Sequence, residues 1–247
     1  MRDASILVLA TGGTIAGQAG SATRRDYRPG QIDISIFLQD FAALGLNARL
    51  EGRQIANIDS ANIGPAIWRA LHEGISAAMD DPTCDGVIVT HGTDTAEETA
   101  FLLDLTLPTV KPVVIVGAMR PADAVGSDGL RNFANAVRVA ADADAPGRGV
   151  LLVMADQVLS ARDARKARTT GSNAFEGFPR GAVALANPAS LDWLQPQWRR
   201  GEAARWQFPQ EFPEVPILHC YAGQTADSVT RLVEAGAQGI VLAGLGD

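Results

Sequence analysis

The sequence contains few of the residues that build disulfide frameworks and transition-metal sites. Its 247 residues include two cysteines and three histidines. Cys84 and Cys220 lie far apart and form no Cys-x-x-Cys pair, which excludes a disulfide framework and a zinc site. There is no His-Glu-x-x-His motif and no Gly-x-Ser-x-Gly motif, so a histidine-based metal site and a Ser-His-Asp triad are not indicated. We therefore expect no metal and no cofactor.

Long apolar runs and an excess of positive charge are also missing. No run of eighteen apolar residues occurs, so no membrane-spanning helix is expected. Lys and Arg number 21 against 28 Asp and Glu, a formal charge of −7 that opposes nucleic-acid binding. We expect a small-molecule partner, with no nucleic acid and no membrane. The first apolar run leads into a glycine-rich turn and is not a signal peptide. A cytoplasmic protein is expected, or a periplasmic one if a signal peptide was removed before Met1.

Two similar turns stand out among the residues that are present. Residues 6–17 (ILVLATGGTIAG) pass from an apolar run into a threonine, Thr14, flanked by glycines. Residues 86–94 (GVIVTHGTD) repeat the design and deliver Thr93. In parallel sheets, ligands bind beyond the carboxyl ends of the strands. The pattern therefore predicts that two hydroxyls far apart in sequence meet in one binding site.

A nucleotide-binding interpretation of the first turn fails on detail. A dinucleotide fingerprint needs glycine at the first, third and sixth positions, and the third position from Gly12 is Thr14. A P-loop needs a lysine followed by Ser or Thr, where this chain has Gln18 and Ala19. A simpler alternative stays open: Gly12 and Gly13 form only a tight strand exit, with Thr14 as a helix cap.

Apolar runs alternate with amphipathic stretches over residues 1–186. Strands are predicted near 5–10, 48–55, 86–90, 112–117 and 149–154, and helices near 33–43, 65–79, 95–106 and 127–142. This βα alternation predicts an α/β fold, with a large N-terminal catalytic domain built on a mostly parallel sheet flanked by helices.

The composition of the sequence changes after this domain. Residues 187–213 are predicted to be a linker. Because three tryptophans lie within it, we expect the linker to pack against another part of the protein. Residues 214–247 are predicted to begin a smaller C-terminal α/β domain, with a strand at 215–218, a helix at 225–235 and a strand at 238–243. A unit this small cannot bury both faces of its sheet. We therefore expect either a partner that covers it or a truncated domain.

Residues 18–31 form a long segment directly after the first threonine turn. It contains Tyr27 and almost no aliphatic residues. Long loops in compact domains are often binding loops, and this position favours a lid over the site. The alternative is a surface loop without such a role.

A threonine hydroxyl is a poor nucleophile until a base takes its proton. Lys166 follows the 149–154 strand in a basic run, SARDARKAR. Unlike arginine, lysine has a pKa that burial can lower into the working range. A relay through Thr93, Lys166 and Asp94 is chemically sensible. The alternative, a solvated lysine in a basic run, stays open on spacing alone.

Residues 10–17 (ATGGTIAG) and 89–95 (VTHGTDT) resemble the two signature motifs of the bacterial-type L-asparaginase/glutaminase family of threonine amidohydrolases. The similarity extends to NIDS at 57–60, VGAMRP at 116–121, SDG at 127–129 and the run from Arg162 to Lys166. It covers essentially the whole chain in the family's order.

The resemblance implies a reaction and its catalytic residues. The side-chain amide of L-asparagine, with L-glutamine as an alternative, is hydrolysed to acid and ammonia through a threonyl acyl-enzyme. By resemblance, Thr14 is the nucleophile and Tyr27 helps to move its proton. Thr93, Asp94 and Lys166 form a second set that activates water or relays protons.

Substrate binding is implied in the same way. Asp94, beside Thr93, holds the α-ammonium group, and Ser60 hydrogen-bonds the α-carboxylate. The Ala118 carbonyl accepts from the scissile amide nitrogen, and main-chain N–H groups of the two turns receive the oxyanion. A homodimer or a homotetramer is implied as the assembly.

Two departures from the family pattern affect these expectations. Family members usually carry Gln or Glu after the serine that Ser60 matches, where this chain has Ala61. The preference between asparagine and glutamine is therefore open. The family's second domain also continues past the point matched by Asp247 and lends residues to a neighbouring subunit. If the molecule ends there, we expect weak activity or a non-catalytic amino-acid-binding protein. A larger amidase such as an amidotransferase subunit is disfavoured by the acidic charge.

Overall fold

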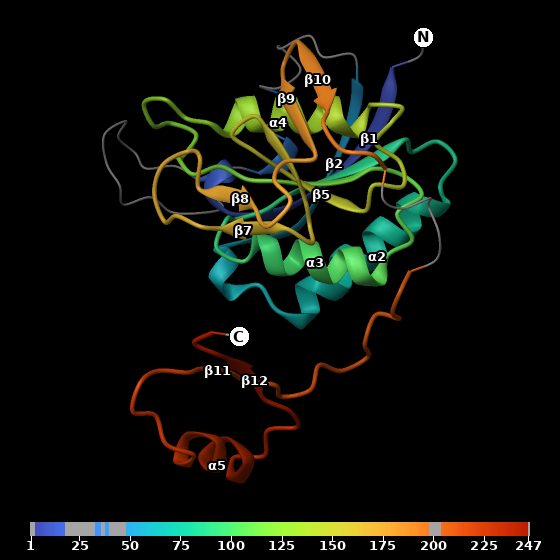
Figure 1. Ribbon diagram of the computed structural model, residues 1–247. Helices are drawn as coiled ribbons and strands as arrows, with labels where there is room; N and C mark the ends of the chain where they lie inside the picture. Colours follow the sequence, from blue (N-terminus) through green and yellow to red (C-terminus); the bar gives the residue numbers. More distant parts are fainter. Residues whose placement is uncertain (1–2, 18–32, 36–37, 40–47, 198–203, 247) are drawn as a thin grey trace. The chain divides into compact units, whose positions relative to one another are not determined.

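The computed structural model describes residues 3–17, 33–35, 38–39, 48–197 and 204–246. The chain forms two compact units, Met1–Phe208 and Pro209–Asp247 (Figure 1).

A mixed eight-stranded sheet forms the centre of the first unit. Five of its strands are mutually parallel, in the order β2-β1-β3-β4-β5: β1 (Ala4–Gly12), β2 (Ala48–Ile58), β3 (Gly86–Thr90), β4 (Val113–Val116) and β5 (Val150–Met154). Beyond β5 the sheet continues antiparallel through β6 (Gln157–Ser160), β9 (Ala184–Asn187) and β10 (Ser190–Trp193). The expected mostly parallel α/β architecture is confirmed.

Helices cover both faces of this sheet (Figure 1). α4 (Gly129–Ala140) packs on one face, where Phe133 joins a core cluster with Val8 and Ile88. α2 (Pro65–Asp80) and α3 (Ala96–Thr106) pack on the other face, around Leu9 and Ile115. Strands β3, β4 and β5 are buried along their whole length, which explains their continuous apolar sequences.

The predicted strands and the helices at 65–79, 95–106 and 127–142 are found within a few residues of their expected ends. The helix expected at 33–43 lies largely outside the described residues. Strands β6, β9 and β10 were not predicted, and neither was the separate hairpin of β7 (Ala164–Lys166) and β8 (Phe175–Gly177). The β5–β6 turn consists of Ala155 and Asp156, both at positive φ. Because that turn contains no glycine, the sequence gives no hairpin signal there.

The segment 187–213 was expected to be a linker, but its described residues up to Phe208 belong to the first unit and include β10. The Arg148 guanidinium lies 3.8 Å from the centroid of the Trp193 ring, whose Nε1 donates to Asp142. The Phe208 ring lies 4.6 Å from the ring of His72. β10 belongs to the sheet because it pairs with β9, and the unit boundary falls at Phe208/Pro209.

The second unit is a small βαβ motif, as predicted. β11 (Ile217–His219) and β12 (Val241–Ala243) are parallel neighbours joined through α5 (Asp227–Glu234). None of the residues of α5 is buried, and Ile217 and Leu242 are 63% and 59% exposed. Across the described parts of both units, no helix combines the length and the apolar character that crossing a membrane requires.

Candidate active site

The two threonine turns lie where the strand order of the parallel sheet reverses. From β1 the chain passes to β2 on one side and then returns to β3 on the other side of β1. Such a reversal opens a crevice outside the carboxyl ends of the two central strands. Thr14 follows the carboxyl end of β1, and Thr93 follows that of β3.

The backbones of the two turns are in direct contact. A Cβ placed on Gly13 would lie 2.4 Å from both N and Cα of Gly92. Gly13 has φ 77° and ψ −171°, a conformation that is essentially restricted to glycine. Its N–H donates to the Ile58 carbonyl at the end of β2, at 3.0 Å. The predicted meeting of the two turns is confirmed, and the glycines are what permit it.

Both threonines are nearly buried, each with 6% of its surface exposed. Thr14 opens a single-turn 3-10 helix, η1 (Thr14–Ala16), whose carbonyl at Thr14 accepts from the Gly17 N–H at 2.9 Å. The Gly17 carbonyl in turn accepts from the Ala122 N–H at 3.0 Å. The first turn is thereby tied to the loop that follows β4.

Lys166 reaches the second turn from the β7–β8 hairpin. Its Nζ donates to Thr93 Oγ1 at 2.8 Å and to the Asp94 carboxylate. The lysine side chain is 15% exposed, whereas that of Asp94 is 57% exposed. The alternative of a solvated lysine in a basic run is therefore wrong. β6 and a loop stand between β5 and Lys166, so the lysine does not simply follow the β5 strand.

Ser60 lies against the same turn from the segment after β2. Its Oγ accepts from the Asp94 N–H at 3.1 Å, and its carbonyl accepts from the Thr95 hydroxyl at 2.8 Å. Ser60 is 2% exposed and opens the short helix η2 (Ser60–Asn62), which Asp59 caps through the Ala61 N–H. Ser60 and Asp94 are thus placed in one hydrogen-bonded group.

The loop after β4 brings Ala118 to this region. A Cβ on Gly117 would lie 3.1 Å from Thr93 Cγ2, so the loop passes directly beside the second threonine. Asp128 fixes the loop by accepting from the N–H groups of Met119 and Arg120, at 3.0 and 2.9 Å. Ala118 is fully buried.

His91, directly before Gly92, was given no role from the sequence. It is fully buried, and burial lowers the pKa of its imidazole from 6.5 to about 4. Its Nδ1 lies 2.6 Å from the Gly92 carbonyl, and its Nε2 lies 2.9 Å from Thr99 Oγ1. Since a carbonyl only accepts, Nδ1 carries the proton and Nε2 accepts from the Thr99 hydroxyl. That hydroxyl also accepts from the Trp68 indole at 2.9 Å, so His91 is a neutral support under the second turn.

The structure therefore brings Ser60, Thr93, Asp94 and Lys166 into one connected group, with the Thr14 turn packed against it. Tyr27 lies outside the described residues. Among the residues that are described, no three His, Cys, Asp or Glu side chains are grouped to hold a metal ion.

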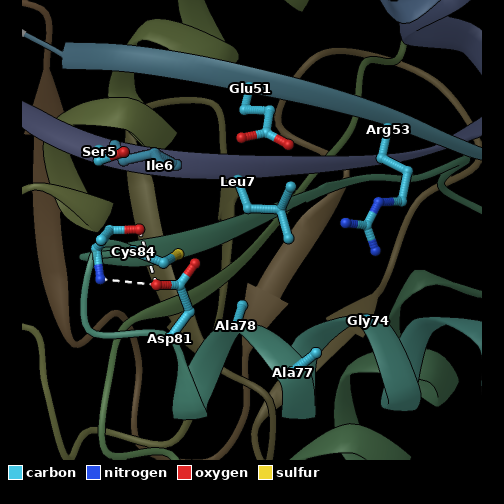
Figure 2. A pocket seen from close by; sticks show the side chains of 11 residues that line it. Ser5, Ile6, Leu7, Glu51, Arg53, Gly74, Ala77, Ala78, Asp81 and Cys84 are labelled. Atoms are coloured by element: carbon cyan, nitrogen blue, oxygen red, sulfur yellow. Dashed lines mark hydrogen bonds between the residues drawn. The ribbon is translucent and has the colours of Figure 1, made fainter.

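A separate pocket of about 130 Å³ lies elsewhere in the first unit (Figure 2). It is lined by Ser5 and Leu7 of β1, by Glu51 and Arg53 of β2 and by one face of α2. The lining residues from β1 and β2 lie before the carboxyl ends of these strands, whereas the threonine turn and Ser60 follow those ends. The pocket is therefore not part of the candidate site.

Residues 5–199 match the family model for the N-terminal domain of asparaginase. The chain belongs to the asparaginase family. It is 39% identical over 247 residues to L-asparaginase 2 of Escherichia coli and 38% identical over 246 residues to a probable periplasmic L-asparaginase of Haemophilus influenzae. Each alignment covers 98% of this chain and 70% of the relative.

A solved structure supports the same family assignment. The crystal structure of a probable cytoplasmic L-asparaginase from Campylobacter jejuni superposes with a TM-score of 0.91 at 35% identity. The superposition covers 99% of this chain and 76% of the other. The family resemblance inferred from the two signature motifs is confirmed.

Proposed function

We propose that this asparaginase-family protein hydrolyses the side-chain amide of L-asparagine to L-aspartate and ammonia through an acyl-enzyme on Thr14. The observation that carries the proposal is the contact between the two threonine turns, with Lys166 bonded to the second of them. This arrangement supplies two hydroxyls and a proton carrier at one sheet edge, which are groups that amide hydrolysis requires.

In the first half of the reaction, Thr14 Oγ1 attacks the carboxamide carbon, and Tyr27 assists the removal of its proton. Main-chain N–H groups of the turns receive the tetrahedral oxyanion, each such donor contributing roughly 2.7–4 kcal/mol. The C–N bond then breaks, and the nitrogen leaves as ammonia after it takes up a proton. The product is an ester between Thr14 and the substrate acyl group.

In the second half, Thr93, Lys166 and Asp94 handle the protons of the attacking water. The 2.8 Å contact between Lys166 Nζ and Thr93 Oγ1 supports this relay. Water adds to the ester carbonyl, the proton it loses passes into the relay, and Thr14 regains its hydroxyl proton as aspartate leaves. The same general acid–base work is typically worth 10²–10⁴-fold in rate.

The substrate is held through both of its α-groups. Asp94, which is largely exposed, presents a carboxylate to the α-ammonium group. Ser60 Oγ accepts from the Asp94 N–H, so its own O–H remains able to donate to the α-carboxylate. The Ala118 carbonyl and the Thr93 turn complete the contacts to the amide. Such a site rejects simple alkyl amides, which would leave these polar groups unpaired.

Substrate preference, assembly and location complete the proposal. Asparagine is the proposed main substrate, with glutamine as the alternative, because Ala61 removes a side chain beside Ser60 that relatives usually carry. A relative in Pseudomonas fluorescens, 35% identical, is named glutaminase-asparaginase. The proposed assembly is a homodimer or homotetramer in the cytoplasm. The proposed domains are a catalytic one that includes the sheet through β10 and a second α/β domain that begins near residue 214, joined by the segment between them.

Ammonia release from L-asparagine and from L-glutamine tests the proposal. Thr14→Ala is expected to lower kcat by at least about 1,000-fold, since the nucleophile is lost. Thr83→Ala is the matched control, because that exposed hydroxyl bonds Asp81 before the start of β3. Equal ammonia production by wild type and Thr14→Ala would remove Thr14 from its role. Calorimetric binding of L-aspartate without any turnover would instead indicate an amino-acid-binding protein.

A further inference from the structure

Glu97 contacts Lys166 at a point that neither the sequence motifs nor the proposed mechanism uses. The main-chain N–H of Lys166 donates to Glu97 Oε2. We propose that Glu97 is a positioning residue that fixes Lys166 for proton transfer with Thr93. The inference rests on the proposed function for its kinetic consequence, but its geometric part is tested independently below.

The need for such a partner follows from the shape of the β7–β8 hairpin. β7 is three residues long and, within the described part of the chain, pairs only with β8 in a two-stranded sheet. Lys166 lies opposite Phe175 in this pairing, and the following N–H groups of Ala167 and Arg168 donate to the Ala174 carbonyl. The Lys166 N–H points to the other edge, where an unpaired donor would be costly once it is shielded from water. The Glu97 carboxylate takes the place of a third strand.

One short segment therefore holds Lys166 at both ends. Thr93 and Asp94 hold its Nζ, and Glu97, three residues after Asp94, holds its main-chain nitrogen. Glu97 lies in the first turn of α3, where the helix dipole stabilises a carboxylate. Because a lysine side chain has many rotamers, fixing its backbone and its tip to one rigid helix start restricts it to few of them. Proton transfer depends on such placement, and a displacement of about 1 Å can cost 10²-fold in rate.

The fold of this region has other anchors, so Glu97 is not needed merely to keep the hairpin folded. Asp163, just before β7, forms a two-bonded ion pair with Arg180 at 2.6 and 2.7 Å and accepts from the Phe178 N–H through its carbonyl. Arg162 lies 3.3 Å from the buried Asp104 of α3. Loss of Glu97 is thus expected to loosen Lys166 while the hairpin stays attached.

Glu98 offers a matched control within the same helical turn. It has the same charge and follows Glu97 directly, but it is exposed. Glu97→Ala is expected to lower kcat by roughly 10–100-fold with KM changed less than about threefold. Glu97→Gln is expected to recover most of the activity, since its amide oxygen still accepts from the Lys166 N–H. Glu98→Ala is expected to match wild type.

A double-mutant cycle separates positioning from general stability. Lys166→Met removes the side chain that Glu97 is proposed to fix, so Glu97→Ala should cost no further activity in that background, within about twofold. If the two losses multiply, Glu97 acts independently of Lys166 and the inference is overturned. A thermal unfolding midpoint for Glu97→Ala within a few degrees of wild type is expected alongside.

Chemical labelling tests the geometry without relying on activity. The sequence contains two lysines, Lys111 and Lys166, so limited acetylation with acetic anhydride followed by peptide mass spectrometry gives two lysine sites to compare, separate from the α-amino group. Lys111 Nζ, bonded to the Ala78 carbonyl, serves as the internal reference. Glu97→Ala is expected to raise acetylation of Lys166 relative to Lys111 several-fold, and Glu98→Ala is not. If Glu97→Ala raises the acetylation of Lys166 but the wild-type protein releases no ammonia, the proposed function is wrong and the positioning role of Glu97 still holds. Equal labelling in both variants would overturn the inference.

Discussion

The turn after β1 and the turn after β3 are built alike and are supported differently. Each follows a buried parallel strand, each presents a threonine beyond a glycine, and the two are pressed together at Gly13 and Gly92. The second turn continues into α3, an eleven-residue helix. The first continues into a 3-10 helix of three residues and is tied to Ala122 through Gly17.

The chemical surroundings of the two hydroxyls differ as well. Thr93 is bonded to Lys166, which arrives from a hairpin more than seventy residues further along the chain. Beneath it, His91 is neutral and fully buried. The residue proposed to move the proton of Thr14 is Tyr27, which follows the first turn in the sequence. A repeated local design thus delivers two hydroxyls to one place, and the partners proposed for them differ in their proton chemistry.

The largest expected effect comes from removing the second hydroxyl. Thr93→Val keeps the methyl group that lies beside Gly117 and deletes the oxygen bonded to Lys166. We expect kcat to fall roughly 10²–10⁴-fold, with ester accumulating on Thr14 because water is no longer activated. Intact-mass spectrometry after mixing with L-asparagine should detect this acyl-enzyme, and Thr14→Ala should form none.

Thr93→Ser retains the hydroxyl and is expected to keep most of the activity, which controls for the loss of packing. If Thr93→Val forms no acyl-enzyme at all, the second hydroxyl is needed for acylation too. The division of work between the two turns would then be wrong.

The next effect concerns the contact that joins the turns. Gly13→Ala places a methyl group 2.4 Å from the Gly92 backbone, and the backbone conformation at this position is one that residues other than glycine rarely adopt. Overpacking and backbone strain together predict a loss of about 2–4 kcal/mol in the free energy of unfolding, with separation of the hydroxyls and loss of turnover. Urea unfolding and the ammonia assay measure both.

Gly64→Ala is the matched control for that substitution. Gly64 has an extended backbone, and a Cβ there meets nothing within 4 Å. It is expected to leave both stability and turnover near the wild-type values. A Gly13→Ala protein that keeps wild-type turnover would mean that the close contact between the turns is not needed for the reaction.

The sequence predicts the parallel part of the fold well because that part is encoded locally. Continuous apolar runs such as those of β3 and β5 belong to strands buried on both faces, and glycine-flanked threonines follow at the correct edge. The antiparallel extension is not predicted, since the Ala155-Asp156 turn gives no glycine signal.

The connections within the site are less predictable for the same reason. The bonds from Lys166 to Thr93 and to Glu97 join residues about seventy positions apart, and no local pattern specifies them. Family resemblance identifies Lys166 but not Glu97. His91 was visible beside Gly92, yet its burial is a property of the packed helices and not of its neighbours in sequence.

His91 provides the smallest of these effects, through the pH dependence of stability. Burial holds its pKa at about 4 in the folded protein, against 6.5 ordinarily. Between these values the unfolded chain binds a proton that the folded chain does not, so stability falls as the pH decreases through this window. At 1.36 kcal/mol per unit, the loss attributable to His91 is about 2 kcal/mol between pH 6.5 and pH 5.

The measurement is urea unfolding at these two pH values, with tryptophan fluorescence as the signal. All four tryptophans lie within Met1–Phe208, so the signal reports on the unit that contains the site. His91→Gln is expected to be less stable overall but to lose about 2 kcal/mol less than wild type on acidification, because glutamine does not titrate. His219→Gln changes an exposed histidine of the second unit and should preserve the wild-type slope. Equal slopes in wild type and His91→Gln would mean that His91 takes up its proton at the same pH in the folded and the unfolded chain, so at pH 5 the second turn would rest on an imidazolium and not on a neutral ring.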